Sequence, residues 1–241
     1  MSIPKDIIQL HEDLIELGSL IRSKSESKFK EEEHIEKNVQ AVFYKIIAYA
    51  ITLHRAVLSL CEEKWTHVTP ILLRTIIDCS ANCLVIIHNE YPEYMAFKYF
   101  YYEYIRILRD NSYSESLRQK NQHDIEQGLR VIQNATAKEK AERSVQEGNV
   151  GIFWFKPEEN NYSSIIRNYG SDELKFLWGG LSMAVHAAHL GLFLFKDDPD
   201  DIDINPCENP IKTKGALIMS CRLLLELLNI ENEYENLGFN S

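Results

Sequence analysis

The sequence predicts an all-α protein, a single-domain bundle of about six or seven helices spanning residues 1–241. Apolar residues recur every three or four positions through most of the chain, which is typical of amphipathic helices. Only 10 Gly and 7 Pro are present, which suits long helices better than a sheet with many turns. We expect an N-terminal helix with a charged connection, a core bundle, an acidic loop and a C-terminal helix, at residues 1–34, 35–195, 196–214 and 215–241.

The apolar spacing predicts the first two helices directly. Residues 4–22 carry one apolar stripe, and the charged residues 23–33 are expected to form a solvated connection or the frayed start of the next helix. A second stripe with steps of three and four predicts one long helix over about residues 32–63. His54 lies beside this stripe, where a histidine is more often a hydrogen-bonded core residue than a ligand.

Residues 69–89 (TPILLRTIIDCSANCLVIIHN) are predicted to form the central helix of the bundle. Thr69 is expected as the N-cap and Pro70 at the first helical position, and the rest is apolar on nearly every face. Three polar residues interrupt it at a spacing of four: Arg74, Asp78 and Asn82. This spacing places them on one face as a polar stripe. A buried charge needs a partner, and the stripe must therefore pair internally, meet another polar group or line a cavity.

The middle of the chain is less regular. Pro92 starts a helix to about residue 110 that is crowded with aromatic residues, either a core helix or a stacking platform for bases. Residues 112–148 are polar and helix-prone, and after Asn134 we expect an exposed helix or a mobile arm. Residues 148–170 are expected to be irregular, apart from a short turn of helix around Ile165.

A second nearly all-apolar helix is predicted to begin after Ser171, which is a good N-cap. Its polar interruptions are Ser182, His186 and His189, of which the first two share a face. The two nearly all-apolar helices should touch, and we expect Arg74, Asp78 and Asn82 to face Ser182 and His186. Trp178, Asn82 and His189 are expected to contribute to ligand binding at the same place.

This predicted site has a catalytic and a structural interpretation. In the first, Arg74 stabilises developing negative charge and His186 acts as general acid or base, with Asp78 fixing its tautomer. In the second, Arg74 and Asp78 form a buried ion pair, and Ser182 and His186 satisfy leftover hydrogen bonds. The sequence alone leaves both open.

Composition excludes several classes of function. The net charge of -10 argues against a broad DNA-binding surface, and the apolar runs are broken by charged residues, from which we expect no membrane span. The five cysteines form no CxxC pair, which fits a reduced, cytoplasmic chain. His186 and His189 lack a nearby acidic partner, and no phosphate-binding loop or dinucleotide fingerprint occurs. We therefore expect no metal and no cofactor.

Several of these motifs together resemble a known family. The segments LLRTIIDCSANCL and LSMAVHAA, with a Tyr-rich helix after a proline and a Trp-containing loop between them, resemble a bacterial family of helical proteins, domain of unknown function 5677. The acid of the first segment is Asp78, where this family more usually has Glu.

That family is in turn similar to the HEPN group of helical bundles, many of which are dimeric, metal-independent endoribonucleases of bacterial stress and antiphage defence. The HEPN resemblance implies a homodimer and an Arg…His motif, and the literal match in this sequence is Arg118 with His123. The alternative is a non-catalytic helical module that binds a small anionic ligand or a partner protein through the stripe. RNA or a nucleotide is the expected ligand.

Overall fold

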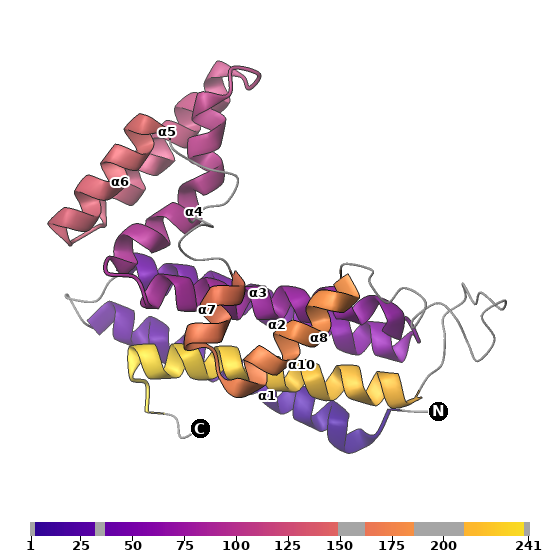
Figure 1. Ribbon diagram of the computed structural model, residues 1–241. Helices are drawn as coiled ribbons and strands as arrows, with labels where there is room; N and C mark the ends of the chain where they lie inside the picture. Colours follow the sequence, from indigo (N-terminus) through magenta and orange to yellow (C-terminus); the bar gives the residue numbers. More distant parts are fainter. Residues whose placement is uncertain (1–2, 32–36, 149–161, 186–209, 239–241) are drawn as a thin grey trace.

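The computed structural model describes residues 3–31, 37–148, 162–185 and 210–238, and every regular element in these ranges is a helix (Figure 1). The all-α prediction is confirmed, but these ranges contain nine α-helices rather than six or seven. The elements are α1 (Lys5–Glu31), α2 (Lys37–Glu62), the 3₁₀ helix η1 (Thr66–Val68), α3 (Thr69–Ile87), α4 (Pro92–Arg109), α5 (Glu115–Arg130), α6 (Ala135–Glu147), α7 (Tyr162–Tyr169), α8 (Asp172–Val185) and α10 (Pro210–Glu235).

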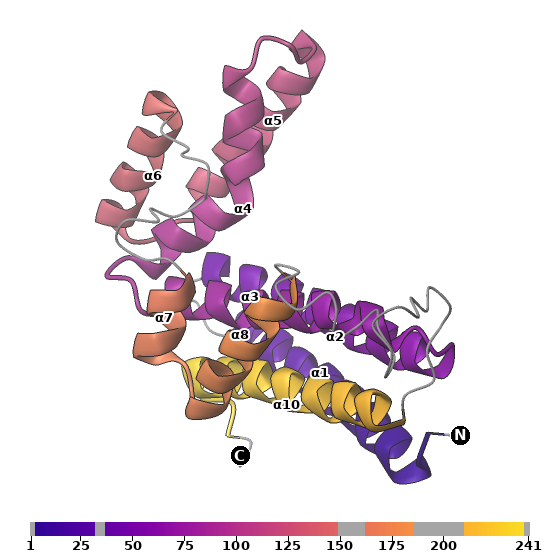
Figure 2. The same ribbon diagram turned by 45° about the vertical axis from the view of Figure 1, so that its right-hand side comes forward.

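Four long helices, α1, α2, α3 and α10, lie side by side and form the main bundle (Figures 1 and 2). Their apolar stripes meet in one core, in which Phe43, Ile47, Ile76 and Leu224 are completely buried. As predicted, α3 is a central helix, because it packs against α2, α10, α4, α7 and α8. Burial of this apolar surface is the main force that holds the bundle together.

Two shorter helices, α7 and α8, lie across α3 and cover part of its length (Figure 1). Ser171 separates them and caps α8 as predicted, since its Oγ accepts a hydrogen bond from the backbone N–H of Leu174 at 3.0 Å. Ile165 and Leu174 are buried against the bundle. Helices α7 and α8 therefore pack against α3, which carries the predicted polar stripe.

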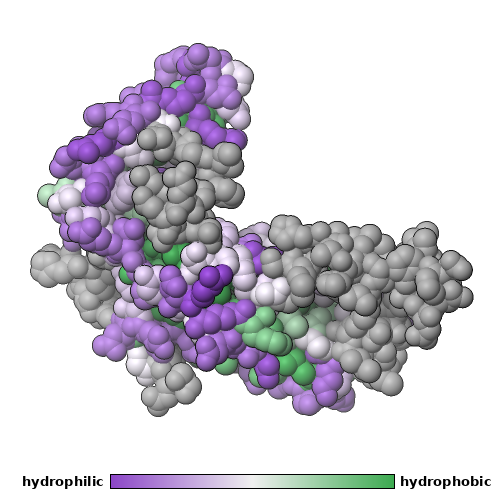
Figure 3. Space-filling view, viewed as in Figure 1, coloured by the Kyte–Doolittle hydropathy of each residue, from purple (hydrophilic) through white to green (hydrophobic). Residues whose placement is uncertain are grey.

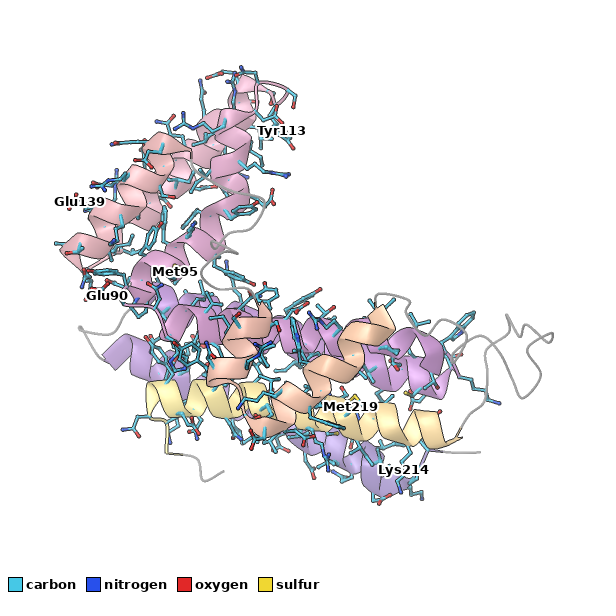
Figure 4. The ribbon with its side chains drawn as sticks, in the orientation of Figure 1. Glu90, Met95, Tyr113, Glu139, Lys214 and Met219 are labelled. Atoms are coloured by element: carbon cyan, nitrogen blue, oxygen red, sulfur yellow. The ribbon has the colours of Figure 1, made fainter. Side chains whose placement is uncertain are left out.

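Helices α4, α5 and α6 form an arm that projects from the bundle (Figures 1 and 2). Figure 4 shows Met95 at the base of the arm and Tyr113 near its tip, and the outer surface of the arm is mostly hydrophilic in Figure 3. The arm has its own small core, which includes Phe97, Ile105 and Ile125. Since α4 contributes to both cores, it carries aromatic residues on many faces. This arrangement supports the core-helix interpretation of α4 over a stacking platform.

Two close contacts hold the arm together. Glu93 of α4 is 2% exposed, and its carboxylate accepts the backbone N–H of Gln133 at 3.0 Å and of Asn134 at 2.7 Å. Gly128 of α5 lies against Tyr101 of α4, and a Cβ added there would be 2.3 Å from the ring carbon Cε2. These contacts fix where the α5–α6 turn and α5 itself sit on α4.

Several predicted boundaries were wrong. Residues 23–31 continue α1 as helix instead of forming a connection, and α10 begins at Pro210 rather than after the acidic loop. The helix-prone stretch 112–148 does form helices, α5 and α6, and α6 is the helix that was one of the two expectations after Asn134. Thr69 is not the N-cap of α3: that position is Val68, because η1 precedes the helix, and the Thr69 hydroxyl donates to Thr66 O at 2.7 Å.

Length and composition alone would allow two of the described helices to cross a membrane, over residues 38–62 and 69–87. Within the most apolar window, 50% of the residues of the first and 61% of the second are buried inside the fold. Core helices of a bundle pass the same test, which makes these two helices weak support for a membrane span.

Candidate functional site

The polar stripe predicted on α3 exists and lies at the interface with α7 and α8. Arg74 Nε is 3.3 Å from Asp78 Oδ1, one helical turn away, and the two side chains are 14% and 33% exposed. Asn82, a further turn along, is 9% exposed. Burial lowers the pKa of Arg74 and raises that of Asp78, and the attraction between the two groups opposes both shifts. Arginine keeps its charge under such a shift, and the pair is therefore an ion pair at the edge of the core.

Aromatic side chains from α7 and α8 cover this stripe. The guanidinium carbon of Arg74 lies 3.2 Å from the ring centroid of Trp178, a cation–π contact. The Tyr162 hydroxyl donates a hydrogen bond of 2.6 Å to Asn82 Oδ1, and its ring meets Trp178 edge to face at 6.1 Å. Arg74, Asn82, Trp178 and Tyr162 thus form one connected group, which we call the α3 site together with Asp78.

The ion pair of the α3 site leaves two polar atoms without a hydrogen bond. Arg74 Nη1 and Asp78 Oδ1 are buried and have no hydrogen-bond partner among the described residues. The contact between Nε and Oδ1 has an ion-pair distance but lacks hydrogen-bond geometry. A buried polar atom without a partner costs about 1–3 kcal/mol, and more when it belongs to a charged group. In the α3 site, Arg74 Nη1 is therefore an unused donor, and Asp78 Oδ1 is an acceptor held only by its ion-pair contact with Arg74 Nε.

The other predicted members of this site fall at or beyond the end of α8. Ser182 lies within α8, whose backbone crosses α3, but its side chain is outside the described residues. His186 and His189 lie outside the described residues altogether. Their predicted meeting with Arg74 stays a prediction. Trp178, predicted as a ligand-binding residue, does join the stripe.

The second predicted pair, Arg118 and His123, lies on α5 in the arm. Arg118 is held by Glu115 at 2.7 Å and by Asn111 at 3.2 Å, and His123 shares a hydrogen bond of 2.8 Å with Gln127. Five positions along a helix rotate a side chain by about 140° to a different face. Within one chain these two side chains therefore do not converge on one point.

One member of the α3 site was missed by the sequence analysis. Tyr162 begins the short helix that was expected around Ile165, but no spacing links it to Asn82, which is 80 residues away. His54, in contrast, is the buried, hydrogen-bonded residue that was expected: it is 0% exposed, with Nδ1 2.7 Å from Ser220 Oγ.

Fold and site together define a helical bundle with an arm and an aromatic-covered ion pair on its central helix. The chain belongs to a family of unknown function, DUF5677, whose model matches residues 40–202. The matched region contains the whole α3 site and the arm, and it confirms the family resemblance found in the motifs. No curated protein and no solved structure matches the chain.

Proposed function

We propose that this protein is a recognition module that binds a nucleotide at the α3 site, with Arg74 and Asp78 contacting its base. The observation that carries the proposal is the pair of buried polar atoms without hydrogen bonds, Arg74 Nη1 and Asp78 Oδ1. Their free energy cost is recovered when a ligand supplies an acceptor to the first and a donor to the second.

The charges favour this ligand over a simple anion. Asp78 lies beside Arg74 and would repel a lone carboxylate or phosphate, since both carry the same sign of charge. A nucleobase edge offers an acceptor next to a donor and is neutral. Guanine is the best match, because its O6 accepts from Arg and its ring N–H donates to a carboxylate. The nucleotide's phosphate group carries the negative charge expected of the ligand, and it would lie away from the Arg74–Asp78 ion pair.

Access to the site requires Trp178 to move. Its ring covers the Arg74 guanidinium, and both unpaired atoms are shielded from solvent. The Asp78 side chain is 33% exposed, more than that of Arg74, and a ligand would therefore approach the ion pair from the side of Asp78. Binding should therefore change the fluorescence of Trp178, and this change provides a direct readout.

The test is calorimetric titration with guanosine 5′-monophosphate, adenosine 5′-monophosphate and inorganic phosphate. Wild type should bind the guanine nucleotide most tightly, and Arg74→Gln and Asp78→Asn should each weaken binding by about tenfold or more. Arg143→Gln is the matched control, because Arg143 forms an i,i+4 ion pair with Glu139 that is exposed on both sides. It should bind as wild type does. Absence of nucleotide binding, together with a much lower melting temperature for Arg74→Gln than for Arg143→Gln, would assign the stripe to structure alone.

A second candidate is the activity that the HEPN resemblance implies, a metal-independent endoribonuclease that acts as a homodimer in bacterial stress or antiphage defence. It is supported by a pocket of about 220 Å³ between α4, α5 and α6, which Arg109 and Arg118 line, and by the exposed His123 on the same helix. Since Arg118 and His123 point to different faces, Arg118 of one protomer would act with His123 of the other.

The nuclease candidate is tested by RNA cleavage with purified protein. Wild type should cleave, and both Arg118→Ala and His123→Ala should abolish cleavage while melting as wild type does. A mixture of the two variants should recover part of the activity, because a mixed dimer retains one intact composite site. An inactive wild type, or active single variants, would refute this candidate and leave the nucleotide-binding proposal standing on its own test.

A further inference from the structure

Three helices of the main bundle bring a second set of polar side chains together, apart from those of the α3 site. His11 of α1 and His54 of α2 are both 0% exposed, and Cys221 of α10 is 4% exposed. One nitrogen of each imidazole and the Cys221 sulfur lie within 4.8 Å of one another. Figure 4 labels Lys214 and Met219 on α10, and the cysteine follows in the next half-turn of that helix. We call these three residues the His–His–Cys cluster.

The hydrogen bonds of the two histidines orient their rings. His11 Nε2 lies 3.1 Å from the backbone carbonyl oxygen of Leu217, and since a carbonyl oxygen only accepts, Nε2 carries the hydrogen. His54 Nδ1 lies 2.7 Å from Ser220 Oγ. The two rings stack with centroids 4.0 Å apart and planes inclined by 12°. Leu217 and Ser220 belong to the same helix as Cys221, and α10 therefore positions all three members of the cluster.

The remaining ring nitrogens have no partner. His11 Nδ1 and His54 Nε2 are buried without a hydrogen bond among the described residues. Burial lowers the pKa of both imidazoles, that of His54 to about 3, and both rings are therefore neutral at neutral pH. His11 Nδ1 then carries a free lone pair, and so does His54 Nε2 when Nδ1 donates to Ser220. A histidine bound to a metal shows this arrangement, with one nitrogen facing the ion and the other N–H donated to a carbonyl or similar acceptor.

We propose that the His–His–Cys cluster binds a metal ion that prefers nitrogen and sulfur ligands, either Cu⁺ or Zn²⁺. Both ions accept two imidazoles and a thiolate. The Cys221 thiol loses its proton to solvent as the sulfur–metal bond forms, and no oxidation or reduction takes place. With one thiolate, Cu⁺ gives a neutral site and Zn²⁺ a site with one positive charge. The neutral site is less costly in an apolar core.

Binding one ion requires the ligand atoms to move closer together. A metal bonded to nitrogen at about 2.0 Å and to sulfur at about 2.3 Å brings its ligand atoms to roughly 3.5 Å from one another. The ligand atoms now lie within 4.8 Å of one another, and because the two rings stack almost in parallel, at least one ring must rotate for both to face a single ion. The bound ion would join α1 and α10, near the two ends of the chain, to α2. His11 and Cys221 lie outside the family match at residues 40–202, whereas His54 lies inside it, and none of the three belongs to the α3 site.

The test uses the full chain, refolded under reducing conditions with Cu⁺, Zn²⁺ or Co²⁺ as a spectroscopic probe, because a site this buried fills most readily as the protein folds. We expect one equivalent of metal per chain, a thiolate-to-cobalt charge-transfer band with Co²⁺, and a higher melting temperature with metal than without. Competition between Cu⁺ and Zn²⁺ identifies the preferred ion.

Two variants and a control locate the site. Cys221→Ser should abolish the charge-transfer band, and His11→Phe should weaken metal binding at least tenfold while keeping the ring stack. Cys61→Ser is the matched control, because Cys61 is equally buried on α2 but outside the cluster, and it should bind as wild type does. A folded wild type that binds no metal would refute the proposal. The same holds if Cys221→Ser and His11→Phe both bind metal as wild type does.

Discussion

Glu231 on α10 is a buried acid whose ionisation should make the stability of the bundle fall as pH rises. Its side chain is 1% exposed, and neither carboxyl oxygen has a hydrogen-bond partner among the described residues. Burial raises the pKa of Glu231 from 4.5 to about 8, the negative charge of Glu235 adds to the shift, and Arg22 opposes it. In the folded protein this carboxyl group is therefore largely protonated at neutral pH.

The direction of the pH effect follows from the two protonation states. In the unfolded chain Glu231 loses its proton near pH 4.5, whereas in the fold it keeps the proton up to about pH 8. Its contribution to stability is complete below pH 4.5 and is lost as pH rises through about 8. Between these limits the unfolding free energy falls by about 1.4 kcal/mol per pH unit, and by pH 7 about 3 kcal/mol of the stability contributed by Glu231 is lost. Glu231→Gln has no proton to lose, and this slope disappears.

The assay is urea denaturation of wild type and Glu231→Gln at pH 5, 6, 7 and 8. The difference in unfolding free energy should shift in favour of the variant by up to about 3 kcal/mol between pH 5 and 8. Glu233→Gln, exposed on the same helix, is the control and should show no such trend. A difference between Glu231→Gln and wild type that stays constant over this range would refute the raised pKa and the reasoning from burial.

Three further changes test the arm and the α3 site. Gly128→Ala should destabilise the arm by about 1–3 kcal/mol, because the new methyl group meets the Tyr101 ring at 2.3 Å. Glu93→Gln should cost about 1–3 kcal/mol, because the amide cannot accept both of the backbone N–H groups that the carboxylate binds. Tyr162→Phe should cost about 0.5–1.5 kcal/mol, because it removes the hydroxyl that donates to Asn82. Denaturation followed by far-ultraviolet circular dichroism measures each value.

Gly179→Ala is the control for the glycine substitution. Gly179 also lies inside a helix, but a Cβ there would meet no atom of the described residues within 4 Å. This substitution should be neutral or stabilise by up to about 1 kcal/mol, because alanine is the better helix former. Equal effects of the two substitutions would contradict the contact between Gly128 and Tyr101. For Glu93 and Tyr162, an unchanged unfolding free energy would show that the hydrogen bond contributes nothing net.

The sequence determined much of the secondary structure, because helical periodicity, proline and N-cap residues act within a few positions. Pro92 begins α4 and Ser171 caps α8, as predicted. The stripe on α3 was likewise predictable, since a spacing of four places Arg74, Asp78 and Asn82 on one face of any helix. A charged residue in an otherwise apolar helix also indicates that a group of opposite charge or a hydrogen-bond partner lies nearby, because burying an unpaired charge is costly.

Tertiary structure decided what these residues meet. Contacts between Tyr162 and Asn82, or among His11, His54 and Cys221, join positions far apart in the chain, and no local pattern encodes such a distance. The division of α4 between two cores is also a property of the assembled fold. The sequence by itself therefore determined the helices and their polar faces, through interactions one turn apart. Only packing decided which faces meet, because that choice depends on the burial of apolar surface over the whole molecule.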